Sequence, residues 1–462
     1  MEKMSVKIVV VQISQTRVVC GFNNQDLPSL TLPAQYLTYK SEQEPERTSE
    51  QGSEALNDSI VKVFDKWDML ARCQDPTAEI YQLYDKQGLP CDWDVMDEQW
   101  SYMFKRLGLK FEDYPVCVVL PNELKSSIRK KFVEHLLGYG IPMVQLLNEP
   151  VCNTLSQGRP SGIVVDIGHT GVRVDAVIDG VLFKQYRKEN KIGGAFLNWQ
   201  ICDHLLKRDA NKSTEVWRDA TEWLPTFKNT MLQVSPIELD ANHEIAPHYQ
   251  HMVSPMDHTK SFLLERKQTV TFTNKQLYAI GELLFKPVIN IDKGGSTDTA
   301  DSTAANGSTN GGDAPPPEKL IGIVGLIRSC IQSLLNGANA GATTGASAGG
   351  ASNSGDGSLG GQGSNDSSNA PSHNYTSEQL QSMLLTNILV TGSTSNIQGL
   401  EQRLLNDISV SLNDLTTVRP KILFKPTKLD RTFQSWQAAT TLCRLPLRES
   451  LYAWETLERE TK

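Results

Sequence analysis

The sequence lacks an excess of positive charge and has no clustered cysteines. Among its 462 residues, 45 Lys and Arg stand against 53 Asp and Glu, which gives a formal net charge of −8. A protein of this sign is not expected to grip the phosphate backbone of a nucleic acid directly. The eight cysteines never form Cys-x-x-Cys. They therefore indicate neither a disulfide framework nor a zinc site, and they favour a reducing compartment.

Long apolar runs are also missing. The longest, such as Val116–Leu120 and Leu320–Ile327, are too short to cross a bilayer, and Met1–Gln12 lacks the layout of a cleavable signal. We therefore expect an intracellular protein that is not a membrane protein.

Signatures of catalysis and of metal binding are scarce. The patterns Ser-x-x-Lys, Gly-x-Ser-x-Gly and His-Glu-x-x-His are absent, which argues against nucleophilic hydrolysis. Half of the histidines fall in one polar stretch that has no accompanying cysteines or acidic cluster: His243, His248, His251 and His258. We predict a surface loop there and no metal site.

What the sequence does contain is an alternation of strand and helix patterns. Strands are predicted at Val116–Pro121, Met143–Leu147 and Ile163–Asp166, and helices at Lys125–Leu137 and Glu149–Ser156. Such alternation predicts an α/β architecture.

A short internal repeat suggests that this architecture is duplicated. Val9–Thr16 aligns without a gap on Ile163–Thr170, and each copy continues into a β-rich stretch, Arg17–Phe22 or Val172–Ile178. We expect two lobes, each opening with a β-hairpin, that face each other across a cleft.

Two tracts rich in Gly, Ser, Asn, Ala and Thr, about 293–317 and 336–373, have too little apolar surface to fold and are predicted to be disordered. Between them, Pro317–Leu335 carries apolar residues at helical spacing and is predicted to be a core helix. The tracts are therefore insertions into one domain and do not mark a domain boundary.

Two glycine turns are candidates for binding an anion. Asp166–Gly171 follows a strand, where backbone N–H groups can approach an anion and a carboxylate can hold hydrated magnesium. Thr391–Gly399 lies between a predicted strand, Asn387–Val390, and a predicted helix, Leu400–Ile408, an arrangement common at nucleotide sites. The alternatives are a tight hairpin that needs glycine and an ordinary β-α connection.

Together these segments resemble the actin family. Its ordered landmarks resemble the following parts of the chain: Val9–Phe22, Asn148–Pro150, Gly162–Gly180, Gly193–Gly194, Thr391–Gly399 and Ser435–Ala439. More narrowly, Tyr84–Trp100, Ser213–Ser235 and Leu384–Leu405 resemble an actin-related subfamily of budding yeasts, whose members are subunits of the SWI/SNF and RSC chromatin remodellers.

The resemblance implies a fold with a nucleotide cleft. The expected fold is the actin-like α/β superfold shared with Hsp70 and hexokinase, with two lobes of duplicated β-sheet cores flanked by helices. The first lobe would span 1–160 and be completed by 428–462, and the second would span 161–427. Hinges are expected near Glu149 and Trp436.

Departures from the actin pattern concern the metal and the attacking water. Gln12 stands where actins have Asp, and Ser14 and Thr16 stand where they have glycines. Glu149 replaces the glutamine that orients the water, and Arg173 replaces the histidine that helps to position it. Because phosphoryl transfer depends on positioning and on metal charge, these changes predict loss of turnover.

Further departures lie around the nucleotide. His169 replaces an Asp, Asn229 replaces a glutamate that contacts the nucleoside, and Ser393 replaces a glycine of the adenosine turn. The sequence still predicts a weak or vestigial nucleotide site, with an empty cleft filled by side chains as the alternative. No cofactor is required, although ATP binding stays open. The residues of this site are Ser14, Gln15, Asp166, Gly168, His169, Lys228, Gly392, Ser393 and Thr394.

The resemblance makes assembly the expected function. Actin-fold proteins bind partner helices in an apolar groove near the hinge, and the matching positions are Leu155, Gly158, Leu442, Leu445, Leu447 and Leu451. Read without the resemblance, Leu442, Leu445 and Leu447 are also compatible with core positions or with a loop pinned by Pro446. The partners implied are the HSA helix of a remodeller ATPase, a second actin-related protein and other remodeller subunits. DNA contact would be indirect, and the implied location is the nucleus.

The sequence is also compatible with three other interpretations. One is a nucleotide-gated switch or slow ATPase in which Glu149 acts as the base and Arg173 steadies the γ-phosphate. Another is a sugar kinase of the same superfold, for which the sequence offers no convincing acidic base. Filament formation is a third, against which the insertions and the altered cleft argue.

Overall fold

The computed structural model describes residues 6–41, 59–208, 220–240, 242–264, 269–287, 320–344, 375–423, 431–445 and 454–456. Most of the two predicted insertions lies outside these ranges, so their disorder stays a prediction. Helix α9 (Ile323–Thr344) begins later than predicted and continues beyond the expected end at Leu335. The composition explains the extension, because alanines follow position 335 and alanine has the highest helix propensity.

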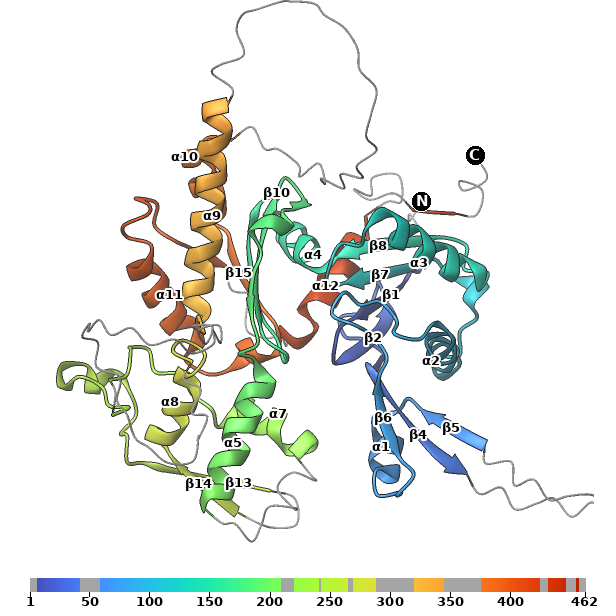
Figure 1. The fold of residues 1–462 in the computed structure, drawn as a ribbon, viewed down its shortest axis with the longest axis horizontal. Helices are drawn as coiled ribbons and strands as arrows, with labels where there is room; N and C mark the ends of the chain where they lie inside the picture. Colours follow the sequence, from blue (N-terminus) through green and yellow to red (C-terminus); the bar gives the residue numbers. More distant parts are fainter. Residues whose placement is uncertain are drawn as a thin grey trace, which may run out of the picture.

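Two halves, each built on a β-sheet, lie side by side in Figure 1. The first sheet has the order β3 (Leu30–Pro33), β2 (Arg17–Phe22), β1 (Val9–Ile13), β7 (Val116–Leu120) and β8 (Val144–Asn148). The second has the order β11 (Val181–Leu182), β10 (Val172–Ile178), β9 (Gly162–Ile167), β15 (Ile388–Thr391) and β16 (Ile422–Leu423), and β12 (Lys188–Asn190) pairs with β10. The central strands are continuous apolar runs because both of their faces are buried.

The two sheets share one connection pattern. In the first, β1 pairs antiparallel with β2 and parallel with β7, and β7 pairs parallel with β8. In the second, β9 pairs antiparallel with β10 and parallel with β15, and β15 pairs parallel with β16. The register places Gln12 opposite Val19 and Asp166 opposite Arg173. The predicted duplication of the hairpins is confirmed, and Gln12 and Asp166 occupy equivalent positions in it.

Helices cover the sheets, and each half has its own apolar core. The predicted helix at Lys125–Leu137 is present with each end shifted by one residue, and the one at Glu149–Ser156 has the predicted bounds. The helices of the first half are α1 (Lys66–Arg72), α2 (Trp93–Arg106), α3 (Ser126–Gly138) and α4 (Glu149–Ser156). Those of the second half are α5 (Gly194–Arg208), α7 (Ala220–Thr230), α8 (Asn274–Glu282), α9, α10 (Ser377–Leu385) and α11 (Leu400–Ser411).

Smaller elements extend both halves. A three-stranded sheet has the order β5 (Ser59–Val63), β4 (Gln35–Ser41) and β6 (Glu79–Gln82), and a hairpin is formed by β13 (Thr259–Leu263) and β14 (Thr269–Thr273). The short 3₁₀ helices are η1 (Phe111–Asp113), η2 (Lys184–Tyr186), η4 (Pro247–Met252), η6 (Ser393–Asn396) and η7 (Arg431–Phe433). Within the described ranges, no helix combines the length and apolar character needed to cross a membrane.

Helices α4 and α12 (Gln434–Leu442) lie between the two sheets (Figure 1) and pack against each other. Helix α12 also contacts β1, where the indole Nε1 of the fully buried Trp436 donates to the carbonyl oxygen of Val10 at 3.0 Å. Near the chain end, Glu455 forms an antiparallel bridge with Val144 at the edge strand β8. The C-terminal part of the chain therefore returns to the first sheet.

Candidate functional site

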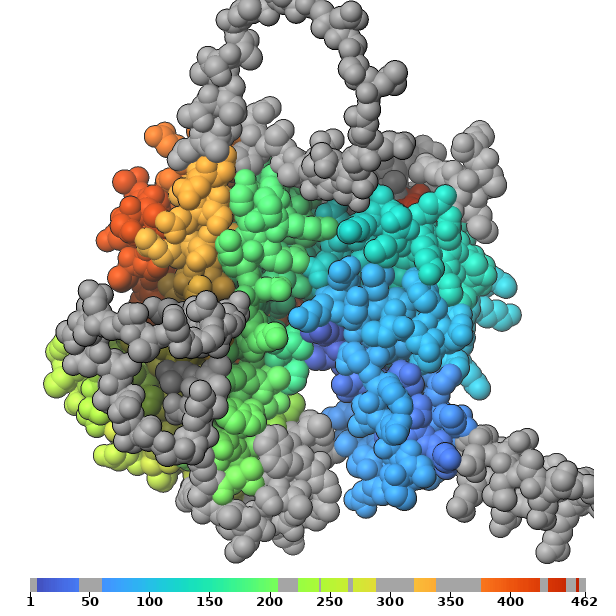
Figure 2. Space-filling model, viewed as in Figure 1, coloured from blue at the N-terminus to red at the C-terminus, as the bar shows by residue number. Residues whose placement is uncertain are grey.

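A cleft of about 130 Å³ lies where the two halves meet, and residues of both halves line it. In Figure 2 the blue segments of the first half stand apart from the green segments of the second in the lower part of the view. The lining comes from the β1–β2 turn, the start of α4, the β9–β10 turn and the turn after β15. A single water needs about 10–15 Å³ of such volume, so the cleft has room for several waters or a small polar group.

Most of the predicted nucleotide residues line this cleft: Ser14, Gln15, Asp166, Gly168, His169, Gly392 and Ser393. Lys228 and Thr394 are buried behind the β9–β10 turn and do not line this cleft, so their part in a nucleotide site stays a prediction. Asn229 follows Lys228 on α7 but is exposed, because adjacent helix positions point in different directions.

The β9–β10 turn is held in place by neighbouring backbone and hydroxyl groups. The backbone N–H of Gly194 donates to the carbonyl oxygen of Gly168 at 3.0 Å, and the hydroxyl of Thr394 donates to the same oxygen at 2.9 Å. Gly392 brings the second turn close, because it adopts a φ of +93° and an added Cβ would lie 2.4 Å from the carbonyl oxygen of Ile167. The two glycine turns predicted from the sequence therefore meet in space.

Behind the turn lies a positively charged corner. The Nζ of Lys228 donates to the carbonyl oxygen of Gly194 at 3.2 Å, and burial lowers the pKa of this lysine to about 8. Burial, followed by the charges of Lys228 and Arg17, lowers the pKa of His169 to about 4, so its imidazole is neutral at pH 7. Burial is the main cause of both shifts, so Lys228 is a cation held largely away from water beside a neutral imidazole.

The β1–β2 turn is closed by its own side chain. The hydroxyl of Ser14 donates to the carbonyl oxygen of Arg17 at 3.0 Å and accepts from the backbone N–H of Arg17 at 3.2 Å. The carbonyl oxygen of Gln15 accepts from the Nε2 of Gln82 at 2.7 Å. The hydroxyl of Ser14 is therefore already bonded within the turn, to the backbone of Arg17.

Sequence reasoning missed three cations that line the cleft: Arg17, Lys86 and Arg431. Arg17 donates to the carbonyl oxygen of Thr432 and lies over the ring of Phe433 at 5.1 Å. Arg431 donates to the carbonyl oxygen of Ser395 at 2.7 Å. Arg17 directly follows the turn of the first predicted hairpin, so the sequence could have indicated it. Lys86 and Arg431 come from distant parts of the chain, and only the tertiary fold brings them to the cleft.

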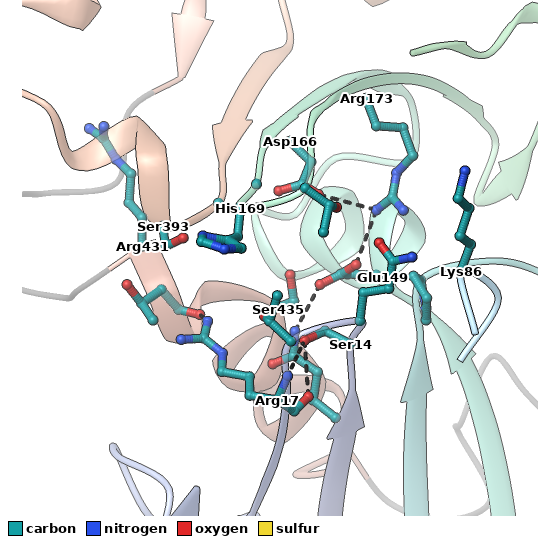
Figure 3. Close-up of a pocket in the computed structure, with 18 residues that line it drawn as sticks. Ser14, Arg17, Lys86, Glu149, Asp166, His169, Arg173, Ser393, Arg431 and Ser435 are labelled. Carbon is teal, nitrogen blue, oxygen red and sulfur yellow. Dashed lines mark hydrogen bonds and ion pairs between the residues drawn. The ribbon is translucent and has the colours of Figure 1, made fainter. Parts of the chain in front are cut away.

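The centre of the cleft is an ionic network around Arg173 (Figure 3). One guanidinium nitrogen, Nη2, lies 3.1 Å from Glu149 Oε2 and 3.4 Å from Asp166 Oδ2. Its Nε lies 3.0 Å from Oδ2 of the buried Asp175. The remaining oxygen of Glu149, Oε1, accepts from the Nε2 of Gln12 at 2.8 Å. A single arginine therefore pairs with three carboxylates.

Burial and charge act against each other in this network. Burial raises the pKa of Asp166 to about 6, and the charge of Arg173 opposes that rise. For Arg173, burial acts to lower the pKa, but the charges of Asp175, Asp166 and Glu149 raise it overall. The guanidinium is therefore cationic, and at pH 7 Asp166 is predominantly ionised.

The predicted partner groove falls on the two central helices and beyond them. Leu155 of α4 packs on a small cluster formed by Val151, Val164, Val177 and Leu182, whereas Leu442 of α12 packs on the cluster that contains Trp436. Gly158 ends α4 with a φ of +67°, and Leu445 is 43% exposed. Leu447 and Leu451 lie outside the described residues.

Comparisons with known proteins agree with this architecture. The family model described as "Actin" matches residues 3–336 and 369–452. The chain is similar to actin-related protein 7 of Saccharomyces cerevisiae, with 28% identity over 99% of this chain and 97% of that protein. It is also similar to actin-related protein 4 of Debaryomyces hansenii, with 27% identity over 44% of this chain and 40% of that protein, and to actin-related protein 4 of Candida glabrata, with 22% identity over 92% and 89%.

Proposed function

This chain belongs to the actin family, and on that premise we propose that it is a non-catalytic actin-related subunit of a chromatin-remodelling complex of the SWI/SNF or RSC type. The proposal rests on its similarity to actin-related protein 7 along almost its whole length. It would act in the nucleus, and its acidic net charge of −8 favours indirect contact with DNA.

The observation that carries the non-catalytic assignment is the engagement of Glu149. Its two carboxylate oxygens are already bonded, Oε1 to Gln12 and Oε2 to Arg173. A general base must hold the attacking water on one of its oxygens, and here each oxygen already accepts a bond from a neighbouring side chain that a water would have to displace or share. Glu149 is therefore poorly suited to activate water, which argues against the slow-ATPase alternative.

Assembly with other proteins is the function that remains. We propose that the chain pairs with a second actin-related protein on the HSA helix of the remodeller ATPase. An amphipathic helix laid in a groove buries anchors at i, i+3, i+4 and i+7. The exposed Leu445, which follows α12, offers an apolar surface for such an anchor, and Leu155, Gly158 and Leu442 lie on or next to the two central helices.

Co-purification tests the proposal directly. The full chain, with and without a candidate actin-related partner, is titrated on an isolated HSA helix, and ATP turnover and bound nucleotide are assayed in the same samples. A stoichiometric complex without turnover is the expected result. Absence of helix binding together with ATP hydrolysis that Asp166→Ala abolishes would establish the slow-ATPase alternative instead.

A matched pair of variants locates the surface. Leu445→Asp places a charge on the proposed groove, and Leu263→Asp makes the same change on hairpin strand β13, where the leucine is 64% exposed. We expect the first to weaken helix binding at least about tenfold, a loss of roughly 1.4 kcal/mol, and the second to leave it unchanged. Equal affinities of the two variants would place the binding surface elsewhere.

A further inference from the structure

We infer that Arg173 takes the place of the divalent cation in this actin-type cleft, so that side chains alone hold its two halves together. The inference goes beyond the proposed function, because it concerns what closes the cleft and not what the protein assembles with.

The residues present do not fit the magnesium ion that the fold family implies. The duplicated hairpins bring Gln12 and Asp166 to equivalent positions, and only Asp166 offers a carboxylate. Gln12 is 4% exposed and carries a neutral amide, whose Oε1 has no hydrogen-bond partner in the described part of the chain. Mg²⁺ binds mainly through carboxylates, phosphates and water, so one of the two hairpins has lost its contribution.

Arg173 occupies the carboxylates that remain. Its guanidinium lies within 3.4 Å of Asp166 and within 3.1 Å of Glu149, and its side chain is only 15% exposed. A divalent cation at this point would have to displace the guanidinium from both carboxylates. It would then leave a buried arginine with fewer counter-charges, which is strongly unfavourable. The geometry therefore excludes the metal by charge as well as by space.

The network also connects the two halves of the molecule. On one side, Gln12 of β1 donates to Glu149 at the start of α4, and Glu149 pairs with Arg173 of β10 (Figure 3). We call the whole set the arginine clasp, and its members are Gln12, Glu149, Asp166, Arg173, Asp175 and Arg187.

A second connection runs through Asp175. Its carboxylate joins Arg173 to Arg187, and Arg187 donates to the amide oxygen of Asn122, which follows β7 of the first sheet. The clasp therefore reaches the first half at two separate points, through Gln12 and Glu149 and through Asn122. Two attachments restrain rotation of one half against the other better than one.

The charges inside the clasp nearly cancel. Arg173 and Arg187 contribute two positive charges against the three carboxylates of Glu149, Asp166 and Asp175. The present state leaves a single excess negative charge without any bound metal ion.

Thermal unfolding of the full chain in EDTA, in MgCl₂ and in CaCl₂, each with and without ATP, tests the inference. For the unchanged protein we expect the same midpoint with EDTA as with either metal, and the same ATP effect in all three. The double variant Gln12→Asp/Arg173→His restores the actin-type residues and is expected to gain a metal-dependent rise of its midpoint. Arg328→His, which breaks the exposed ion pair with Asp414, is the control and should gain none.

Either of two results would overturn the inference: a lower midpoint of the unchanged protein in EDTA, or a folded double variant that ignores both metals. If the double variant does not fold, Gln12→Asp alone replaces it. With Arg173 still in place this variant should stay insensitive to metal, and a gain of metal dependence would count against the clasp. Binding to the HSA helix, measured on the same samples, separates failure of the clasp from failure of the proposed function.

Discussion

Acidification should destabilise the protein through His169. This side chain is partly buried beside Lys228 and Arg17, and its pKa falls from 6.5 to about 4. A basic group whose pKa is lowered by folding contributes nothing above its unfolded pKa, where it is neutral in both states, and it destabilises the folded state increasingly as the pH falls towards the folded pKa. With 1.36 kcal/mol for each pKa unit, the contribution of His169 to the free energy of unfolding should fall by roughly 3 kcal/mol between pH 6.5 and 4, while the raised pKa of Asp166 acts in the opposite direction.

Urea unfolding at a series of pH values from 7.5 to about 4 measures this effect, and the comparison between variants isolates it from other titrating groups. His169→Gln removes the imidazole, so its free energy of unfolding should fall less steeply with pH than that of the unchanged protein. Thr170→Gln changes the exposed neighbour in the same turn and should follow the unchanged protein. Parallel curves for the unchanged protein and His169→Gln would refute the argument that this histidine is held neutral.

Three further predictions concern stability. Lys228→Met should raise the free energy of unfolding, measured in urea at pH 7, by about 1–2 kcal/mol, because burial of the charged lysine lowers its pKa to about 8. The gain in stability should shrink towards pH 10, and a loss of stability at pH 7 would contradict the prediction. Arg403→Met should lower the free energy of unfolding by about 3–5 kcal/mol, because it leaves Glu282 buried without its bidentate partner at 2.6 and 2.7 Å. Adding Glu282→Leu should restore most of the lost stability, and a further loss in the double variant would disprove the pairing. Gly392→Ala should lower the free energy of unfolding by about 2 kcal/mol or more, because its Cβ would collide with the end of β9. Gly158→Ala has open space around its Cβ and should lose less stability, so equal thermal midpoints of the two variants would contradict the prediction.

The features that the sequence predicted well are local ones. The hairpins at Val9–Phe22 and Gly162–Ile178 follow from apolar runs that a strand buries on both faces, and the turn of the second hairpin follows from its glycines. The boundary of α9 was wrong because composition suggested disorder, whereas the alanines after position 335 favour continuation of a helix. Local pattern therefore specified the existence of this helix better than either of its ends.

The charged contacts of the cleft could not be predicted in the same way. Arg173 could be identified as a departure from the actin pattern, but its pairing with Asp175 and the link from there to Arg187 and Asn122 are tertiary. Lys86 reaches the cleft from the loop after β6, far from either glycine turn in sequence. Such contacts join residues that are distant in the chain, so the spacing of residues in the sequence does not predict them.

The glycine turns of this cleft are therefore weak evidence for a nucleotide, whereas its charges are strong evidence about which ligands it excludes. Gly194 and Gly392 are required by packing, since a Cβ on either would lie within 3 Å of neighbouring atoms whether or not a ligand is bound. The charged groups are under no such constraint. At one end Arg173 has satisfied the carboxylates internally, and at the other no carboxylate of the described residues pairs with Lys228. We therefore expect an anion beside Lys228 to be favoured and a divalent cation beside Arg173 to be disfavoured, so that the two kinds of binding can be tested separately.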